Sequence, residues 1–223
     1  MNKSEVDYLD SAILKSLRGD KASAINDFNK AIEINPNNFI AYLHRGIAKY
    51  CLDDFNGAIL DYSKAIELEP NGIDIYKQRA TVYNELKDYQ NAMLDYIKAI
   101  ELMPDGYNSN AIADLYLKMG NAKHELGDFN DAIQVYNIAL ELTPNDYFAY
   151  RDRGISKLSL NKYEEALDDF NEAVNKNPNL FGAYNYRGIV KFLLKDKAGA
   201  KDDFLMAIKL GSENTYDLID KYL

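Results

Sequence analysis

The chain is poor in the residue types that usually carry catalysis or bind metals. It has one cysteine, Cys51, and two histidines, His44 and His124, among 223 residues. One cysteine excludes an internal disulfide and fits a reducing compartment, so we expect a cytoplasmic protein. No His–His or His–Cys spacing suits a metal site, and no glycine-rich phosphate loop is present. We therefore expect no metal, no cofactor and no enzymatic activity.

Positive charge and long apolar runs are also scarce. Lys and Arg number 26 against 35 Asp and Glu, which gives a net charge of −9. Phosphate binding needs a basic stripe, and anionic membranes attract basic segments, so this balance argues against both partners. No apolar run is long enough to span a bilayer, and none follows the first residues as it would in a signal peptide. We expect neither a nucleic acid nor a membrane partner.

Proline is rare, but its spacing is regular. The five prolines are separated by 34, 34, 40 and 34 residues: Pro36, Pro70, Pro104, Pro144 and Pro178. A fixed period of this size indicates a repeat protein, in which one supersecondary unit stacks on copies of itself. Aligning the chain on the prolines gives six repeats, with residues 107–112 outside the register: 5–38, 39–72, 73–106, 113–146, 147–180 and 181–214.

Each repeat carries the same residue types at the same positions. The fourth position is tyrosine, the eighth is small, the twentieth and twenty-seventh are alanine, and the twenty-fourth is aromatic. Small and apolar residues thus recur three and four apart, which is the helical period. Polar dipeptides such as Asp53-Asp54 separate two such helices, and Asn38 and Asp146 suit the caps of following helices. The pattern predicts an all-α stack of helical hairpins.

At these positions the chain resembles the tetratricopeptide repeat family, whose 34-residue unit combines Tyr or Trp, a small residue, two alanines, aromatic residues and proline. The resemblance covers about 5–214. It implies a right-handed α-solenoid of six helix-turn-helix hairpins, forming one domain over 1–223. The segment from Thr215 places Tyr216, Ile219, Tyr222 and Leu223 on one helical side, so we expect a capping helix over 215–223.

The segment 107–112 is the one break in the period. Ser109 or Asn110 is a candidate cap for a helix that runs to about Leu126. If the segment is wholly helical, it lengthens that helix by roughly 9 Å. The alternative is an ordinary variation in loop length without its own function.

The resemblance also implies where a ligand would lie. Ligands of this family usually contact the first helix of each hairpin, so the site residues are inferred from matching positions. Members that bind chaperone C-terminal tails use a Lys and Asn clamp, but here Asn121 is followed by Asp152 and Tyr186, which excludes such tails as partners. The remaining candidates for binding a peptide or partner are His44, Tyr50, Lys77, Gln78, Asn84, Lys118, Asn121, His124, Arg151, Asn185, Tyr186 and Phe192.

These features predict a non-enzymatic scaffold that binds a peptide or a partner protein in its concave groove. The alternative is a self-assembling module in which the tail or the 107–112 segment docks into another copy. A homodimer is one form that such a module could take. The acidic pairs Asp168-Asp169 and Asp202-Asp203 are neighbours that point to different sides of a helix. We interpret them as solvated helix faces and not as acid–base pairs.

Overall fold

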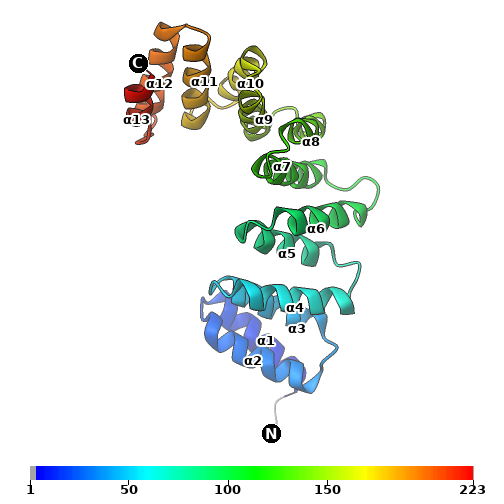
Figure 1. The fold of residues 1–223 in the computed structure, drawn as a ribbon. Helices are drawn as coiled ribbons and strands as arrows, with labels where there is room; N and C mark the ends of the chain where they lie inside the picture. The colour runs from blue at the N-terminus through cyan, green and yellow to red at the C-terminus, as the bar shows by residue number, and fades with distance from the viewer. Residues whose placement is uncertain (1–3, 223) are drawn as a thin grey trace. The chain divides into compact units, whose positions relative to one another are not determined.

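The computed structural model describes residues 4–222, and within that range its regular secondary structure is entirely α-helical (Figure 1). Thirteen helices follow one another along the described chain. They are α1 (Glu5–Leu17), α2 (Lys21–Ile34), α3 (Phe39–Tyr50), α4 (Phe55–Leu68), α5 (Ile73–Glu85), α6 (Tyr89–Glu101), α7 (Ser109–Glu125), α8 (Phe129–Leu142), α9 (Tyr147–Ser159), α10 (Tyr163–Lys176), α11 (Phe181–Leu193), α12 (Lys197–Lys209) and α13 (Thr215–Tyr222).

Consecutive helices pair into six hairpins, from α1 with α2 to α11 with α12. The last helix, α13, packs on α11 and α12 and caps the sixth hairpin. The prediction of an all-α fold of six hairpins with a capping helix is therefore confirmed. Each proline falls just after the second helix of a pair.

Local sequence signals set the helix ends. Asn38 and Asp146 accept hydrogen bonds from the first amides of α3 and α9, as their sequence positions predict. Inside the hairpins, the turn between the two helices carries one residue with positive φ. Gly19 and Gly127 take this role in two hairpins, while Asp53 takes it with φ of 60°. This left-handed residue ends the first helix and redirects the chain into the second.

The hairpins form two compact units of three hairpins each. The first unit ends at Asp105 and contains α1–α6, and the second begins at Gly106 and contains α7–α13. The boundary thus falls next to the 107–112 segment. Our expectation of one continuous domain stays a prediction, and each unit is described by itself below.

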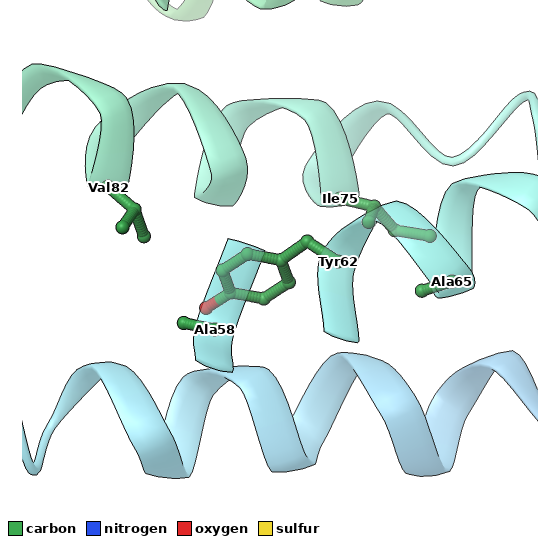
Figure 2. Close-up of a cluster of buried hydrophobic side chains, with 5 residues drawn as sticks. All are labelled: Ala58, Tyr62, Ala65, Ile75 and Val82. Carbon is green, nitrogen blue, oxygen red and sulfur yellow. The ribbon is translucent and has the colours of Figure 1, made fainter. Parts of the chain in front are cut away.

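Alanines and one aromatic ring per hairpin form the core. In the second hairpin Tyr62 of α4 is fully buried, and its ring lies beside Ile75 and Val82 of α5 (Figure 2). The alanines at the twentieth and twenty-seventh positions, such as Ala58 and Ala65, are fully buried as well. Alanine lets the helix backbones approach closely, while the ring fills the space toward the next hairpin.

An arginine joins each hairpin to the preceding one at four places. Arg45 of α3 binds both carboxylate oxygens of Asp61 on α4, at 2.8 Å from Nε and 2.5 Å from Nη2. Its Nη1 donates to Asn29 Oδ1 of the preceding hairpin at 2.7 Å. We call this arrangement the arginine clamp. It recurs at Arg79, Arg153 and Arg187, with Asp95, Asp169 and Asp203 as the paired carboxylates.

The clamp corrects our interpretation of the acidic pairs. Asp168 and Asp202 are exposed, but Asp169 and Asp203 are 3% and 4% exposed and each binds an arginine and a lysine. The two members of each pair do point to different sides, yet only one side is solvated. The missed signal is the repetition of arginine sixteen residues before four buried aspartates: Asp61, Asp95, Asp169 and Asp203.

Three hairpins lack one or more of the clamp residues. In the fourth hairpin Met119 and Val135 stand where other hairpins have arginine and aspartate. In the third hairpin Ile97 stands where Asn29 or Ser63 accepts from a clamp, and its side chain is 42% exposed. The first hairpin has Ser11 in place of arginine and pairs Asp27 with Lys15 instead.

The 107–112 segment extends a helix only in part. Its last four residues form the first turn of α7, which has 17 residues, and the cap is Asn108 instead of the expected Ser109 or Asn110. The extension is therefore about 6 Å and not the 9 Å expected for a wholly helical segment.

The side of α13 that faces the protein differs from the expected one. Thr215 is fully buried and Tyr222 packs edge-on against Phe192, with ring centroids 5.4 Å apart, but Tyr216 is 60% exposed. The expectation for Tyr216 was wrong because Thr215 supplies the buried contact at the start of the helix. Leu223 lies outside the described residues.

Candidate functional site

The twelve candidate residues are divided between the two units. His44, Tyr50, Lys77, Gln78 and Asn84 belong to the first unit, and the other seven belong to the second. Within the second unit, a hollow of about 270 Å³ brings together four of them: Asn121, His124, Arg151 and Tyr186. We call this hollow the Arg151 pocket. Its other lining residues are Glu125, Tyr136, Asp152 and Ile155.

The floor of the Arg151 pocket is a buried hydrogen-bond network. Tyr136 is 1% exposed, and its hydroxyl donates to Asn121 Oδ1 at 2.6 Å. Burial raises the pKa of the Tyr136 phenol well above its ordinary value, so the ring stays neutral and remains a donor. Because Asn121 Oδ1 is occupied by the phenol, its Nδ2 is left as a donor toward a ligand.

A second chain of hydrogen bonds fixes His124. Its Nδ1 lies 2.8 Å from Ser156 Oγ, and that oxygen lies 3.2 Å from the backbone oxygen of Asp152. Which atom donates between His124 and Ser156 depends on the tautomer of the ring. With Nδ1 engaged by Ser156, Nε2 is the ring nitrogen without a partner among the described residues.

Arg151 carries the main unpaired donors of the pocket. Its Nε donates to Asp152 Oδ1 at 2.6 Å, and its guanidinium lies 5.0 Å from the centre of the Phe148 ring. Among the described residues neither terminal nitrogen has a hydrogen-bond acceptor. The side chain is 26% exposed, so these N–H groups are accessible but partly shielded from solvent. They are therefore available to a ligand.

A second hollow of about 460 Å³ lies at the beginning of the same helices. It is lined by the first turns of α7, the turn between α8 and α9, and Phe148 at the start of α9. We call it the Phe148 pocket, and we call the two pockets together the α7–α9 groove. Asn110 from the extra turn of α7 lines this pocket, so the 107–112 segment contributes to its wall.

The other candidates of the second unit are engaged elsewhere. Lys118 pairs with Asp114 at 2.9 Å. Asn185 Nδ2 donates to Ser212 Oγ at 3.0 Å, and its Oδ1 accepts from Thr215 at 2.7 Å, so this residue holds the start of α13. Phe192 of α11 packs against Tyr222 of α13. Sequence positions alone could not reveal these contacts, because they depend on how α13 packs.

In the first unit the candidates form no comparable network. Tyr50 packs against Phe55 with centroids 5.8 Å apart, and Lys77 pairs with Asp74 at 3.0 Å. Gln78 is half-buried on α5. Asn84 Oδ1 is buried and has no hydrogen-bond partner among the described residues. The role of all twelve residues in binding stays a prediction.

His44 has a structural contact that leads to a pH prediction. Its ring stacks on Phe28 at 6.2 Å, and burial lowers its pKa below the ordinary 6.5. The unfolded chain therefore binds a proton more readily than the folded one as the pH falls below 6.5. We expect the first unit to lose stability as the pH falls from 6.5 through the folded pKa, and His44→Phe to weaken this loss. Urea unfolding of both proteins at pH 7.5 and 5.5 measures the difference, and equal losses would contradict the prediction.

The described residues contain neither a metal-binding cluster nor a membrane-spanning helix. No group of three or more His, Cys, Asp or Glu side chains within residues 4–222 is arranged to hold a metal ion. In the same range, each helix is too short or too polar to cross a lipid bilayer.

Comparison with protein families gives matches over much of the chain. A model described as TPR repeat matches residues 17–53 and 120–159. Two models described as tetratricopeptide repeat match residues 73–105 and 151–214. A search of curated proteins finds no significant match.

Many solved structures share the fold at low sequence identity. YrrB, a TPR protein with an unusual peptide-binding site, is 23% identical with a TM-score of 0.67, covering 88% of this chain and 98% of YrrB. PilW, a widely conserved type IV pilus biogenesis factor, is 17% identical with a TM-score of 0.75, covering 98% of this chain and 100% of PilW. MamA is 20% identical with a TM-score of 0.68, covering 80% and 94%. At these identities the likeness shows the fold alone.

Proposed function

Because the chain belongs to the tetratricopeptide repeat family, we propose that it is a non-enzymatic scaffold that binds a peptide or a partner protein in the α7–α9 groove. One observation carries the proposal: the terminal nitrogens of Arg151 are unpaired in a partly shielded pocket. Partly desolvated donors of this kind gain most from a ligand that supplies acceptors. The single cysteine supports a cytoplasmic location as part of the same proposal.

The nature of the pocket supports binding over catalysis. Its polar groups are held by hydrogen bonds to one another, as in the pair Tyr136 and Asn121, and its acidic residues flank an arginine. Such an array orients a ligand through donors and acceptors. A peptide offers matching groups along its backbone, and the Phe148 pocket offers space for a side chain beside it.

A double substitution tests the proposal. We expect Asn121→Ala combined with Arg151→Ala to abolish capture of partners from a lysate, because both changes remove donors from the pocket. The buried Tyr136 hydroxyl loses its acceptor, so stability should fall by about 1–3 kcal/mol while the helical content stays unchanged. Capture on immobilised full-length protein, followed by mass spectrometry, measures the effect. Lys201→Ala, an exposed change on α12, is the matched control. Unchanged capture by the double variant would reject the groove as the binding surface.

The alternative of self-assembly stays a prediction. In the described chain α13 packs on its own α11 and α12, and the 107–112 segment supplies the first turn of α7. These contacts favour roles within the chain for both segments, so the groove is our first candidate for partner binding.

A further inference from the structure

The Arg151 pocket presents hydrogen-bond donors and acceptors side by side. The donors are the terminal nitrogens of Arg151 and Nδ2 of Asn121, which have no acceptors among the described residues. The acceptor is the exposed carboxylate of Glu125, and Nε2 of His124, whose Nδ1 is engaged by Ser156, accepts or donates according to the tautomer of the ring. A ligand that satisfies this pocket must itself both accept and donate.

The charges of the pocket exclude the simplest ligand groups. One cation, Arg151, faces two anions, Asp152 and Glu125, and Asp152 is already bound to the arginine at 2.6 Å. A carboxylate would approach a lining with net negative charge, and an ammonium group would approach the arginine. Like-charge contacts of either kind cost binding energy. A neutral group that carries both a carbonyl oxygen and an NH₂ avoids both penalties, and this is the primary amide of Asn or Gln.

The Phe148 pocket calls for a different group. Leu117, Leu142 and Phe148 line it, and the Phe148 ring is 40% exposed. An apolar side chain bound there would cover this ring and remove apolar surface from water. The Phe148 ring is held in place by Arg151, whose guanidinium lies 5.0 Å from the centre of the ring. The two pockets therefore adjoin at Phe148 and Arg151.

The distance between the pockets fits a short stretch of extended chain. Leu117 in one pocket and His124 in the other are seven residues apart on α7, or about 10 Å along the helix axis. A peptide in the polyproline II conformation advances about 3.1 Å per residue and has three residues per turn. Side chains three residues apart on such a peptide lie on the same side, about 9 Å apart, and thus reach both pockets at once.

We propose that the α7–α9 groove recognises an extended peptide segment in the polyproline II conformation, in which a primary amide side chain enters the Arg151 pocket and an apolar side chain, three residues away, enters the Phe148 pocket. This inference rests on the proposed function and adds the chemistry of the ligand. The amide oxygen accepts from Arg151 and Asn121, while the amide NH₂ donates to Glu125. Gln or Asn is preferred to Glu because the carboxylate has no proton to donate.

Capped peptides test the proposal directly. The probes are Ac-Ala-Leu-Ala-Ala-Gln-Ala-NHMe, its reversed sequence, and versions with Glu or Leu in place of Gln, titrated into ¹⁵N-labelled full-length protein. We expect the Gln peptide in one of the two sequence directions to bind about tenfold more tightly than its Glu and Leu versions, because these versions lose hydrogen bonds to the pocket. The shifted amide signals should come from α7 and α9. The C-terminal methylamide keeps the Gln side chain as the one primary amide of the probe.

Variants separate the two parts of the site. Asn121→Ala with Arg151→Ala should remove the preference for Gln, Phe148→Ala should weaken all peptides that carry Leu, and Lys201→Ala should change nothing. Equal binding of Gln, Glu and Leu peptides would overturn amide recognition and leave the proposed peptide groove intact. If every probe fails to bind, the amide proposal is also rejected, and the lysate capture decides separately whether the groove binds a partner.

Discussion

Replacing Arg153 by alanine is expected to lower the free energy of unfolding of the second unit by about 2–4 kcal/mol, since removing one partner of a buried ion pair leaves the other charge poorly compensated. The change removes two hydrogen bonds to Asp169 and one to Asn137 of the preceding hairpin. Lys157 remains 2.8 Å from Asp169, which places the expected loss below that of a fully orphaned charge. Urea unfolding with hydrogen exchange on α7–α12 measures the effect, and the exchange of α1–α6 should stay unchanged.

Two controls make the result specific to the clamp. Lys201→Ala removes a cation from the same unit at an exposed position on α12, so we expect it to cost less than about 1 kcal/mol. Arg153→Met with Asp169→Val reproduces the pair Met119 and Val135 that the fourth hairpin already contains. Apolar pairs can replace buried ion pairs at little cost. The double change should therefore be milder than Arg153→Ala, and a loss as large as that of Arg153→Ala would contradict this account.

Gly120→Val is expected to destabilise the second unit by about 2–3 kcal/mol through overpacking. A Cβ atom at Gly120 would lie 2.4 Å from Cε1 of Tyr136, and this ring is 1% exposed and cannot move into solvent. Ala12 and Ala80 occupy the same position in other hairpins, so alanine is tolerated where the two helices have adjusted to it. Valine adds two further methyl groups, for which no hairpin makes room. Thermal unfolding followed by circular dichroism gives the comparison.

A second helical glycine supplies the matched control for Gly120. At Gly182, near the start of α11, the nearest atom to an added Cβ is Cδ of Arg151 at 3.9 Å, which is an ordinary contact. Gly182→Ala should therefore stabilise the protein by up to about 1 kcal/mol, because alanine favours the helix. If Gly182→Ala lowers the stability, or if Gly120→Val does not, contact with an aromatic ring does not determine which side chains these positions tolerate.

The fold was largely predictable because its signals are local and repeated. The period of the prolines and the positions of alanine and aromatic residues define the hairpins, and caps such as Asn38 and Asp146 are legible one residue at a time. The arginine clamp was missed although it repeats, because the arginine and its two partners lie on three helices. Each of the three, considered alone, reads as an ordinary polar residue on a helix surface. Burial of Asp169 and Asp203 follows only from packing.

The site was predictable only in outline. Matching helix positions put Asn121, His124, Arg151 and Tyr186 on a common surface, and the structure brings these four into one pocket. Nothing in the sequence indicates that Tyr136 occupies Asn121 Oδ1 or that α13 covers Phe192. Such pairings depend on side-chain geometry between helices, which a repeat alignment does not contain.

The arginine clamp also restricts where the chain can gain residues. Each clamp arginine lies sixteen residues from its partner in the preceding hairpin and sixteen from its aspartate, as Arg45 does from Asn29 and Asp61. An insertion inside either span would pull the guanidinium away from a partner. Insertions are therefore tolerated only outside the spans that a clamp connects. The extra residues 107–112 lie between Ile97 and Met119, the interval in which the sequence lacks clamp residues. The departure from the 34-residue period is thus found in the one interval between repeats that no clamp connects.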